Sequence, residues 1–156
     1  MTQALLTMGH RVRVVRRSRG APLDGVELVI GDAFDRAFCV GAAAGATAVY
    51  HCLNVAYSAR AWRTELPKFQ ENLIEAAGKA DARLVVFENL YMLGQPDGAL
   101  DENTPTKPIS KKGAAREKLS EDLFAAHRAG TVKAVAGRAS DLFGPGVVQS
   151  HIGEQL

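Results

Sequence analysis

Short apolar runs alternate with helix-like segments along this chain, and this alternation constrains the fold more than any other feature. Five runs have the length and residue types of buried strands: Val12–Val15, Val26–Ile30, Thr47–Leu53, Arg83–Phe87 and Val132–Ala136. Three segments have helical patterns: Phe34–Ala44, Ser58–Ala80 with a bend or restart near Pro67, and Lys111–Arg128. Strands that alternate with helices predict an α/β fold, in which a mostly parallel sheet carries helices on its faces.

The chain opens at an unexpected point for such a fold. Met1–His10 has the pattern of the tail of an amphipathic helix, and it leads directly into the first apolar run. In nucleotide-binding α/β domains, a strand and a glycine-rich turn come before that order of elements. If the chain resembles the dinucleotide-binding folds whose strands run in the order 3-2-1-4-5-6, that order implies that the missing strand would be central, between Val12–Val15 and Thr47–Leu53. Its absence would leave a gap about one strand (~5 Å) too wide for hydrogen bonding. Because unpaired buried backbone groups are costly, we expect the two strands to close together, another chain to fill the slot, or the fold to be marginally stable.

Composition indicates one ordinary globular domain. The 156 residues are 47% hydrophobic and 23% charged, and the net charge of +2 gives no argument for binding nucleic acid or a membrane. No apolar run approaches the ~20 residues of a membrane span, and no signal peptide is recognisable, so we expect a cytoplasmic protein. Cys39 and Cys52 are expected to be reduced and buried, with a disulfide as the alternative. Val147–Leu156 has the pattern of a helix that is cut off.

Candidate ligand-binding residues follow the first two strands. Arg16 and Arg17 end the first strand, and no carboxylate follows before Asp24. In dinucleotide-binding folds an acidic side chain at this point binds the ribose 2′-hydroxyl, whereas arginine pairs with a 2′-phosphate, so the sequence favours NADP, with NAD as the alternative cofactor. A solvated basic strand end is the other interpretation. Asp32, after the second strand, could hold an adenine amino group, cap the next helix, or do both.

Polar residues also follow the later strands. His51 lies in an apolar run, which favours a core histidine over a catalytic base, and four histidines without a spaced Cys/His set predict no metal site. Glu88, Asn89 and Tyr91 lie where a strand breaks into a turn. In open α/β sheets such positions line the ligand crevice. The alternative is that Asn89 and Tyr91 only satisfy backbone groups of the loop.

The order of these segments resembles the NAD(P)-dependent epimerase/dehydratase family, part of the extended short-chain dehydrogenase/reductase superfamily. The similar segments are Ala4–Arg16, Val29–Asp32, Ala48–Leu53, Val85–Gly94 and Gly137–Gly146. The resemblance implies a Rossmann-like, doubly wound parallel sheet that lacks the usual first strand and glycine-rich loop. It also implies that residues 1–156 are a partial NAD(P)-binding domain without most of the substrate-binding part. The cofactor-binding residues that it implies are Arg16, Arg17, Asp32, Ala33, Leu53, Asn54 and Arg138.

The chain departs from the family pattern at the catalytic positions. The position of the catalytic serine or threonine falls on Asn89, and no tyrosine occurs after Tyr91. The Tyr-x-x-x-Lys pair of the family aligns with Gly113 and Glu117, or with Lys112 and Arg116 after a shift of one residue. Neither alignment restores the phenol that family members use for proton transfer.

Three functional hypotheses follow. The first is an atypical oxidoreductase, isomerase or dehydratase in which Tyr91, Asn89 and Lys112 take over the chemistry, with Tyr91 preferred as the acid/base and Glu88 also considered. The second is a nucleotide-binding sensor or regulator without catalysis, and the third is a truncated remnant. We expect the full-length parent to be an enzyme for a small-molecule substrate and this chain alone to be inactive, and a homo-oligomer stays open.

Overall fold

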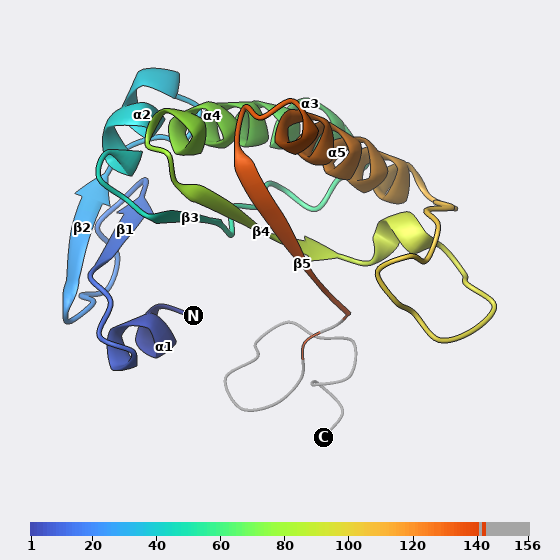
Figure 1. Ribbon diagram of the computed structural model, residues 1–156, viewed down its shortest axis with the longest axis horizontal. Coiled ribbons are helices and arrows are strands. Elements are labelled where there is room, and N and C mark those ends of the chain that lie inside the picture. The colour runs from blue at the N-terminus through green and yellow to red at the C-terminus, as the bar shows by residue number, and fades with distance from the viewer. Residues whose placement is uncertain (141, 143–156) are drawn as a thin grey trace.

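The computed structural model describes residues 1–140 and 142, and it has the expected parallel α/β architecture (Figure 1). The strands are β1 (Val12–Arg16), β2 (Val26–Ile30), β3 (Ala48–His51), β4 (Arg83–Asn89) and β5 (Lys133–Ala139). The helices are α1 (Thr2–Thr7), α2 (Arg36–Ala43), α3 (Ala59–Thr64), α4 (Leu66–Lys79) and α5 (Lys111–Arg128), with a 3₁₀ turn η1 (Tyr91–Leu93). The expected Val147–Leu156 helix and the end of the Gly137–Gly146 segment, from residue 143 on, lie outside the described residues.

The sheet is split in two. β1 pairs with β2, and β4 pairs with both β3 and β5, all in parallel, but no ladder joins β1 to β3. In Figure 1, β1 and β2 are steeply inclined to β3. Of the three expected outcomes, closure of the two strands is therefore wrong. A physical reason is that α2 packs against α4 and shares a hydrophobic cluster with it, which attaches the β1–β2 unit through helices rather than through strand pairing.

The core lies between the helices and one face of the three-stranded sheet. Leu84 and Val86 of β4 face this core, where they pack with Ala77 of α4 and Leu123 of α5. A second cluster gathers Trp62, Leu66, Phe69 and Leu119. The opposite face of β3–β5 exposes Tyr50, Phe87 and Val135 at 40%, 51% and 46%. α1 lies on the side of the strands away from α4 and α5 (Figure 1).

Local signals set most helix boundaries. The segment expected to bend or restart near Pro67 restarts there: α3 ends at Thr64 and α4 begins at Leu66. Pro67 occupies the first turn of α4, where a missing N–H costs nothing. Asp35, rather than Asp32, is the N-cap of α2, because its carboxylate accepts the Phe38 N–H at 3.0 Å. The capping role considered for Asp32 is therefore wrong.

The cysteines are both free, but only one is buried. Cys39 is buried on α2, where its thiol contacts the carbonyl of Ala33 at 3.4 Å, and Cys52 is exposed. The prediction that Cys52 is buried is wrong because β3 ends at His51, one residue before it, rather than continuing to Leu53.

Candidate functional site

The ends of β1 and β2 hold the first group of candidate residues. The Gly31 N–H donates to the Arg16 carbonyl at 2.9 Å, which fixes the two strand ends beside each other. The Arg16 guanidinium bonds to the carbonyls of Arg19 and Ala21 and so orders its own loop, whereas Arg17 is exposed. Arg17 makes no ion pair within the described part of the chain. Of the two predicted arginines, Arg17 is thus the one available to a ligand.

The segment after β2 presents a carboxylate beside this arginine pair. Asp32 is exposed, and its Oδ1 accepts the Phe34 N–H at 2.9 Å. Ala33 is buried, and its carbonyl accepts a 2.8 Å hydrogen bond from Nδ2 of Asn72 on α4. Gly31 has no room for a side chain, because a Cβ there would overlap the ring of Phe38. The chain therefore holds Asp32 in place through its neighbours while the carboxylate stays accessible.

The candidates after β3 are exposed. Leu53 is 36% exposed, and its N–H donates to Nδ1 of His51 at 3.3 Å, while Asn54 is an exposed loop residue. His51 itself is 4% exposed, and burial, with a smaller contribution from Arg116, lowers its pKa to about 4. A neutral, hydrogen-bonded imidazole in the core confirms the prediction of a core histidine.

An aromatic and cationic cluster lies where β4 ends and α5 begins. The rings of Trp62 and Tyr91 stack with centroids 5.8 Å apart, and Tyr57 meets Trp62 edge-on at 5.7 Å. The hydroxyls of Tyr57 and Tyr91 are 2.9 Å apart. Lys112 Nζ lies 3.0 Å from the centroid of Tyr57, and the Arg116 guanidinium lies 4.7 Å from that of Trp62. These contacts place the predicted Tyr91 and Lys112 in one cluster.

The geometry also separates the two alignments of the family's catalytic pair. A Cβ on Gly113 would lie 2.5 Å from the Tyr91 carbonyl oxygen, so this position has no space for a side chain. Lys112 and Arg116, one turn apart on α5, both reach the aromatic rings. The side chains that face the cluster are therefore those of the shifted alignment.

Buried charges lie behind the cluster. Glu88 is 1% exposed, and its Oε2 accepts from Arg138 Nε at 3.2 Å, while Arg138 Nη2 donates to Ser120 Oγ at 2.8 Å. Burial raises the pKa of Glu88 against the opposing effects of Arg138 and Arg116, and burial likewise lowers the pKa of Arg116. Arg138, predicted to bind a cofactor, is thus engaged with Glu88 and Ser120.

Three buried polar atoms in this region have no hydrogen-bond partner among the described residues: Trp62 Nε1, Arg116 Nε and Glu88 Oε1. Buried polar groups in native proteins are almost always paired. These two donors and one acceptor are exceptions to that rule among the described residues.

The predicted Asn89 has a local role in the structure. Its Oδ1 accepts the Tyr91 N–H at 3.2 Å and so fixes the turn that carries Tyr91. Sequence reasoning missed Tyr57 and Trp62. Trp62 is the single tryptophan of the chain and lies on an apolar stripe with Leu66 and Phe69, which is a usable signal, whereas nothing in the sequence distinguishes Tyr57.

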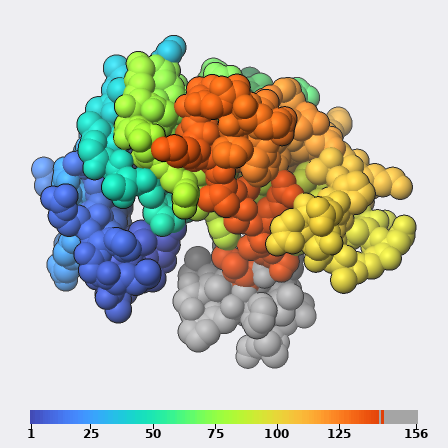
Figure 2. All heavy atoms as spheres, in the orientation of Figure 1, coloured from blue at the N-terminus to red at the C-terminus, as the bar shows by residue number. Residues whose placement is uncertain are grey.

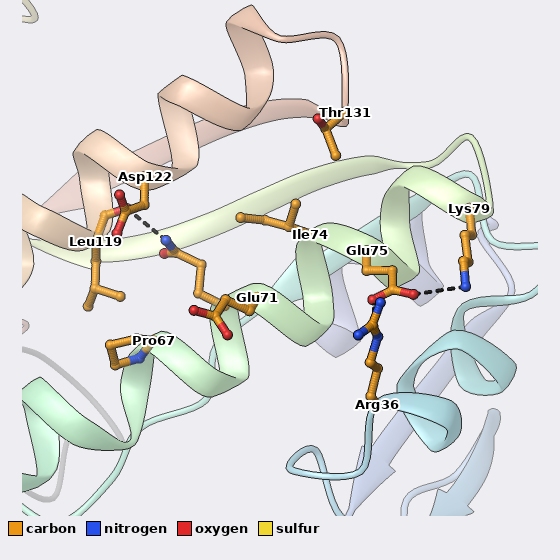
Figure 3. A pocket seen from close by; sticks show the side chains of 10 residues that line it. Arg36, Pro67, Glu71, Ile74, Glu75, Lys79, Leu119, Asp122 and Thr131 are labelled. Atoms are coloured by element: carbon orange, nitrogen blue, oxygen red, sulfur yellow. Dashed lines mark hydrogen bonds and ion pairs between the residues drawn. The ribbon is translucent and has the colours of Figure 1, made fainter.

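A groove of about 600 Å³ lies elsewhere, between α4 and α5 (Figure 3). Its charged lining is largely self-paired, since Glu75 binds both Arg36 and Lys79. It contains none of the predicted site residues, which argues against this groove as the reactive site. Within the described part of the chain, no three His, Cys, Asp or Glu side chains gather as a metal ion would require, and no helix has the length and apolar character needed to cross a membrane.

Parallel strands with polar residues at their carboxyl ends define a Rossmann-like α/β protein. The chain belongs to the NAD dependent epimerase/dehydratase family, whose model matches residues 1–155. No curated protein matches the chain.

Three solved enzyme structures illustrate the similarity of fold. A UDP-galactose 4-epimerase superposes with a TM-score of 0.79 at 22% identity, covering 95% of this chain and 54% of its own. The NAD complex of the Brucella ovis UDP-glucose 4-epimerase gives 0.75 at 18% identity, covering 90% and 47%. The Streptomyces venezuelae dTDP-glucose 4,6-dehydratase, also with NAD, gives 0.76 at 21%, covering 92% and 52%. The chain thus spans about half the length of these structures.

Proposed function

We propose that this chain binds the adenosine part of a nicotinamide dinucleotide, with a preference for NADP, as part of an epimerase/dehydratase-type oxidoreductase or isomerase. The observation that carries the proposal is the arginine pair of β1 beside the exposed carboxylate of Asp32, joined by the hydrogen bond from Gly31 to Arg16. Arginine at this strand end matches a ribose 2′-phosphate. Family membership and the NAD complexes of similar folds support a dinucleotide ligand.

The described residues fit the adenosine half of such a cofactor better than its centre. Arg17 would pair with the 2′-phosphate, Asp32 and Ala33 would border the adenine, and Leu53 and Asn54 would follow along the next strand end. The sequence has no Gly-x-x-Gly-x-x-Gly motif to bind the pyrophosphate. When bound, the nicotinamide would supply hydride transfer.

For the chemistry, we propose Tyr91 as the proton donor and acceptor. Asn89 positions Tyr91 through the 3.2 Å hydrogen bond to its backbone, and Lys112 places a positive charge beside the phenol pair. Phenols in such roles transfer protons directly to and from a substrate oxygen. Arg138 stabilises the end of β4, next to the turn that carries Tyr91, by its hydrogen bond to Glu88.

A second candidate is a nucleotide-binding protein without catalysis. It is favoured by Gly113, which stands at one alignment of the family's catalytic tyrosine and has no space for a side chain. Turnover of NADPH with a carbonyl substrate, and its loss in Tyr91→Phe, would exclude this candidate.

Calorimetric titration with NADPH and NADH tests the proposal. We expect NADPH to bind more tightly, and Arg17→Glu to weaken NADPH by about 10- to 100-fold, the usual size of a lost charge-assisted hydrogen bond, with NADH unchanged. Arg11→Glu is the matched control, because it makes the same charge change just before the opposite end of β1 and should leave both affinities alone. Equal affinity for the two cofactors, or no effect of Arg17→Glu, would reject NADP preference. No binding up to millimolar concentration would reject the function.

A further inference from the structure

Two of the three tyrosines of this chain meet at their hydroxyls. Tyr57, in the loop before α3, is 64% exposed, and Tyr91, in η1, is half-buried. Their oxygens are 2.9 Å apart, which is a direct hydrogen bond in which either phenol can be the donor. The contact joins a half-buried phenol to an exposed one.

The pair is held from two sides. Trp62, 1% exposed, stacks against Tyr91 and meets Tyr57 edge-on, so the two rings share one buried support. Lys112 places its ammonium 3.0 Å from the Tyr57 centroid. A positive charge this close stabilises a phenolate relative to a neutral phenol.

We propose that Tyr57 and Tyr91 form a coupled pair that shares one proton, and that Tyr57, under Lys112, exchanges that proton with solvent. This inference rests on the proposed role of Tyr91 and adds Tyr57 as a positioning residue that acts through it. Tyr57 lies outside every segment that resembles the family.

The charges around the pair favour a single negative charge on it. On α5, Lys112 contacts Tyr57 and Arg116 lies against Trp62. Behind them, Glu88 of β4 is paired with Arg138 of β5, and His51 of β3 is neutral because burial holds its pKa at about 4. One phenolate is therefore stabilised by Lys112, whereas a second would meet repulsion from the first.

The proton balance is simple. Before the transfer both hydroxyls carry their protons. The Tyr91 O–H bond breaks as its proton passes to a substrate oxygen, and the Tyr57 hydroxyl then gives its proton to the Tyr91 oxygen, which leaves one proton shared by the pair and one negative charge. Water returns a proton to Tyr57 and leaves as hydroxide, so no electrons are gained or lost. Protons can reach Tyr91 in this way while its ring stays half-buried.

Ultraviolet titration of the phenols tests the pair without any substrate. Tyr50→Phe removes the third tyrosine, which lies on β3, so that absorbance reports only Tyr57 and Tyr91. We expect one phenol to ionise about one pH unit below the ordinary value of about 10 and the other above it. In this background Tyr57→Phe should remove the early step and Lys112→Met should move it to higher pH.

Lys111→Met is the matched control, because Lys111 is the exposed neighbour of Lys112 on α5 and should not alter the titration. Circular dichroism at each pH defines the range in which the fold holds. If the protein unfolds before the phenols have ionised, all tyrosines can be replaced by 3-fluorotyrosine. Its phenol is more acidic, so the same comparison can be made at a lower pH, where the fold holds. Two phenols that ionise together at the ordinary value, or an early step that Lys112→Met leaves in place, would overturn the proposal.

The titration and the calorimetry can fail separately. If the cofactor does not bind but the two phenols ionise in separate steps, the proposed function is rejected and the phenol pair is retained. If the cofactor binds but the two phenols ionise together, only the phenol pair is rejected.

Discussion

Three buried ionisable side chains determine the charge distribution in the site. His51, Glu88 and Arg116 are each less than a tenth exposed and lie beneath the helices, where an isolated charge is costly. The protein manages this by keeping His51 neutral and by pairing Glu88 with Arg138. The pKa of Glu88 is still raised, because the loss of hydration outweighs that pairing.

The neutral state of His51 predicts a pH dependence of stability. Its pKa is about 4 in the folded chain against an ordinary value of 6.5, so between these values only the unfolded chain binds the proton. The stability associated with His51 is therefore complete above 6.5 and is lost as the pH falls toward 4. Urea unfolding should show that His51→Gln, which keeps an acceptor for the Leu53 N–H, removes about 2 kcal/mol of the loss between about pH 7.5 and about pH 5.

His10→Gln is the control for this prediction, since His10 is exposed before β1. It should unfold with the same pH dependence as the unchanged chain. If His51→Gln showed the same pH dependence as His10→Gln, the conclusion that His51 is buried in its neutral form would be rejected.

At the scale of elements, the approach of α5 to η1 builds the aromatic cluster. Ser110 caps α5 through the Gly113 N–H at 3.0 Å, and Gly113 then packs against the Tyr91 carbonyl. This close contact lets Lys112 reach Tyr57 across the turn. The glycine is therefore a packing requirement as well as a departure from the family pattern.

Gly113→Ala should push α5 away from η1. Its Cβ would lie 2.5 Å from a backbone oxygen, so we expect a loss of about 1–3 kcal/mol in the free energy of unfolding by urea. The same change at Gly41, in α2 with open space around it, should instead stabilise the chain by about 0.5–1 kcal/mol. Equal effects at the two positions would contradict the close contact.

The sequence patterns predicted where most helices and strands lie, but not which of them contact one another. The bounds of β2 and α5 agree with the structure because apolar runs, Ser110 and Gly130 mark their ends locally. β3 is shorter than its apolar run, since among the described strands it pairs with β4 alone and none extends the ladder on its other side. The contact between Tyr57 and Tyr91 joins residues 34 apart in sequence, and only the tertiary fold creates it.

In the whole molecule, the β1–β2 unit and the three-stranded sheet are held together by helix packing. The N-terminal strands lie at one end in Figure 2, and the 94–108 loop lies at the other. One hydrophobic cluster connects the ends, because it contains Ala33 near the arginine pair together with Trp62 and Tyr91. The Ala33 segment and the aromatic cluster therefore border the same hydrophobic cluster, whereas no continuous sheet joins the described strands.

A nitrogen–proton correlation NMR titration with adenosine 2′,5′-bisphosphate tests the central claim most directly, because this ligand carries the 2′-phosphate without the nicotinamide. We predict shifts concentrated at Arg16, Arg17, Asp32 and Ala33, and much weaker shifts with 5′-AMP. The α4–α5 groove, reported by Glu71 and Asp122, should stay unchanged. Shifts centred on that groove, or equal responses to the two nucleotides, would contradict an adenosine 2′-phosphate site at the ends of β1 and β2.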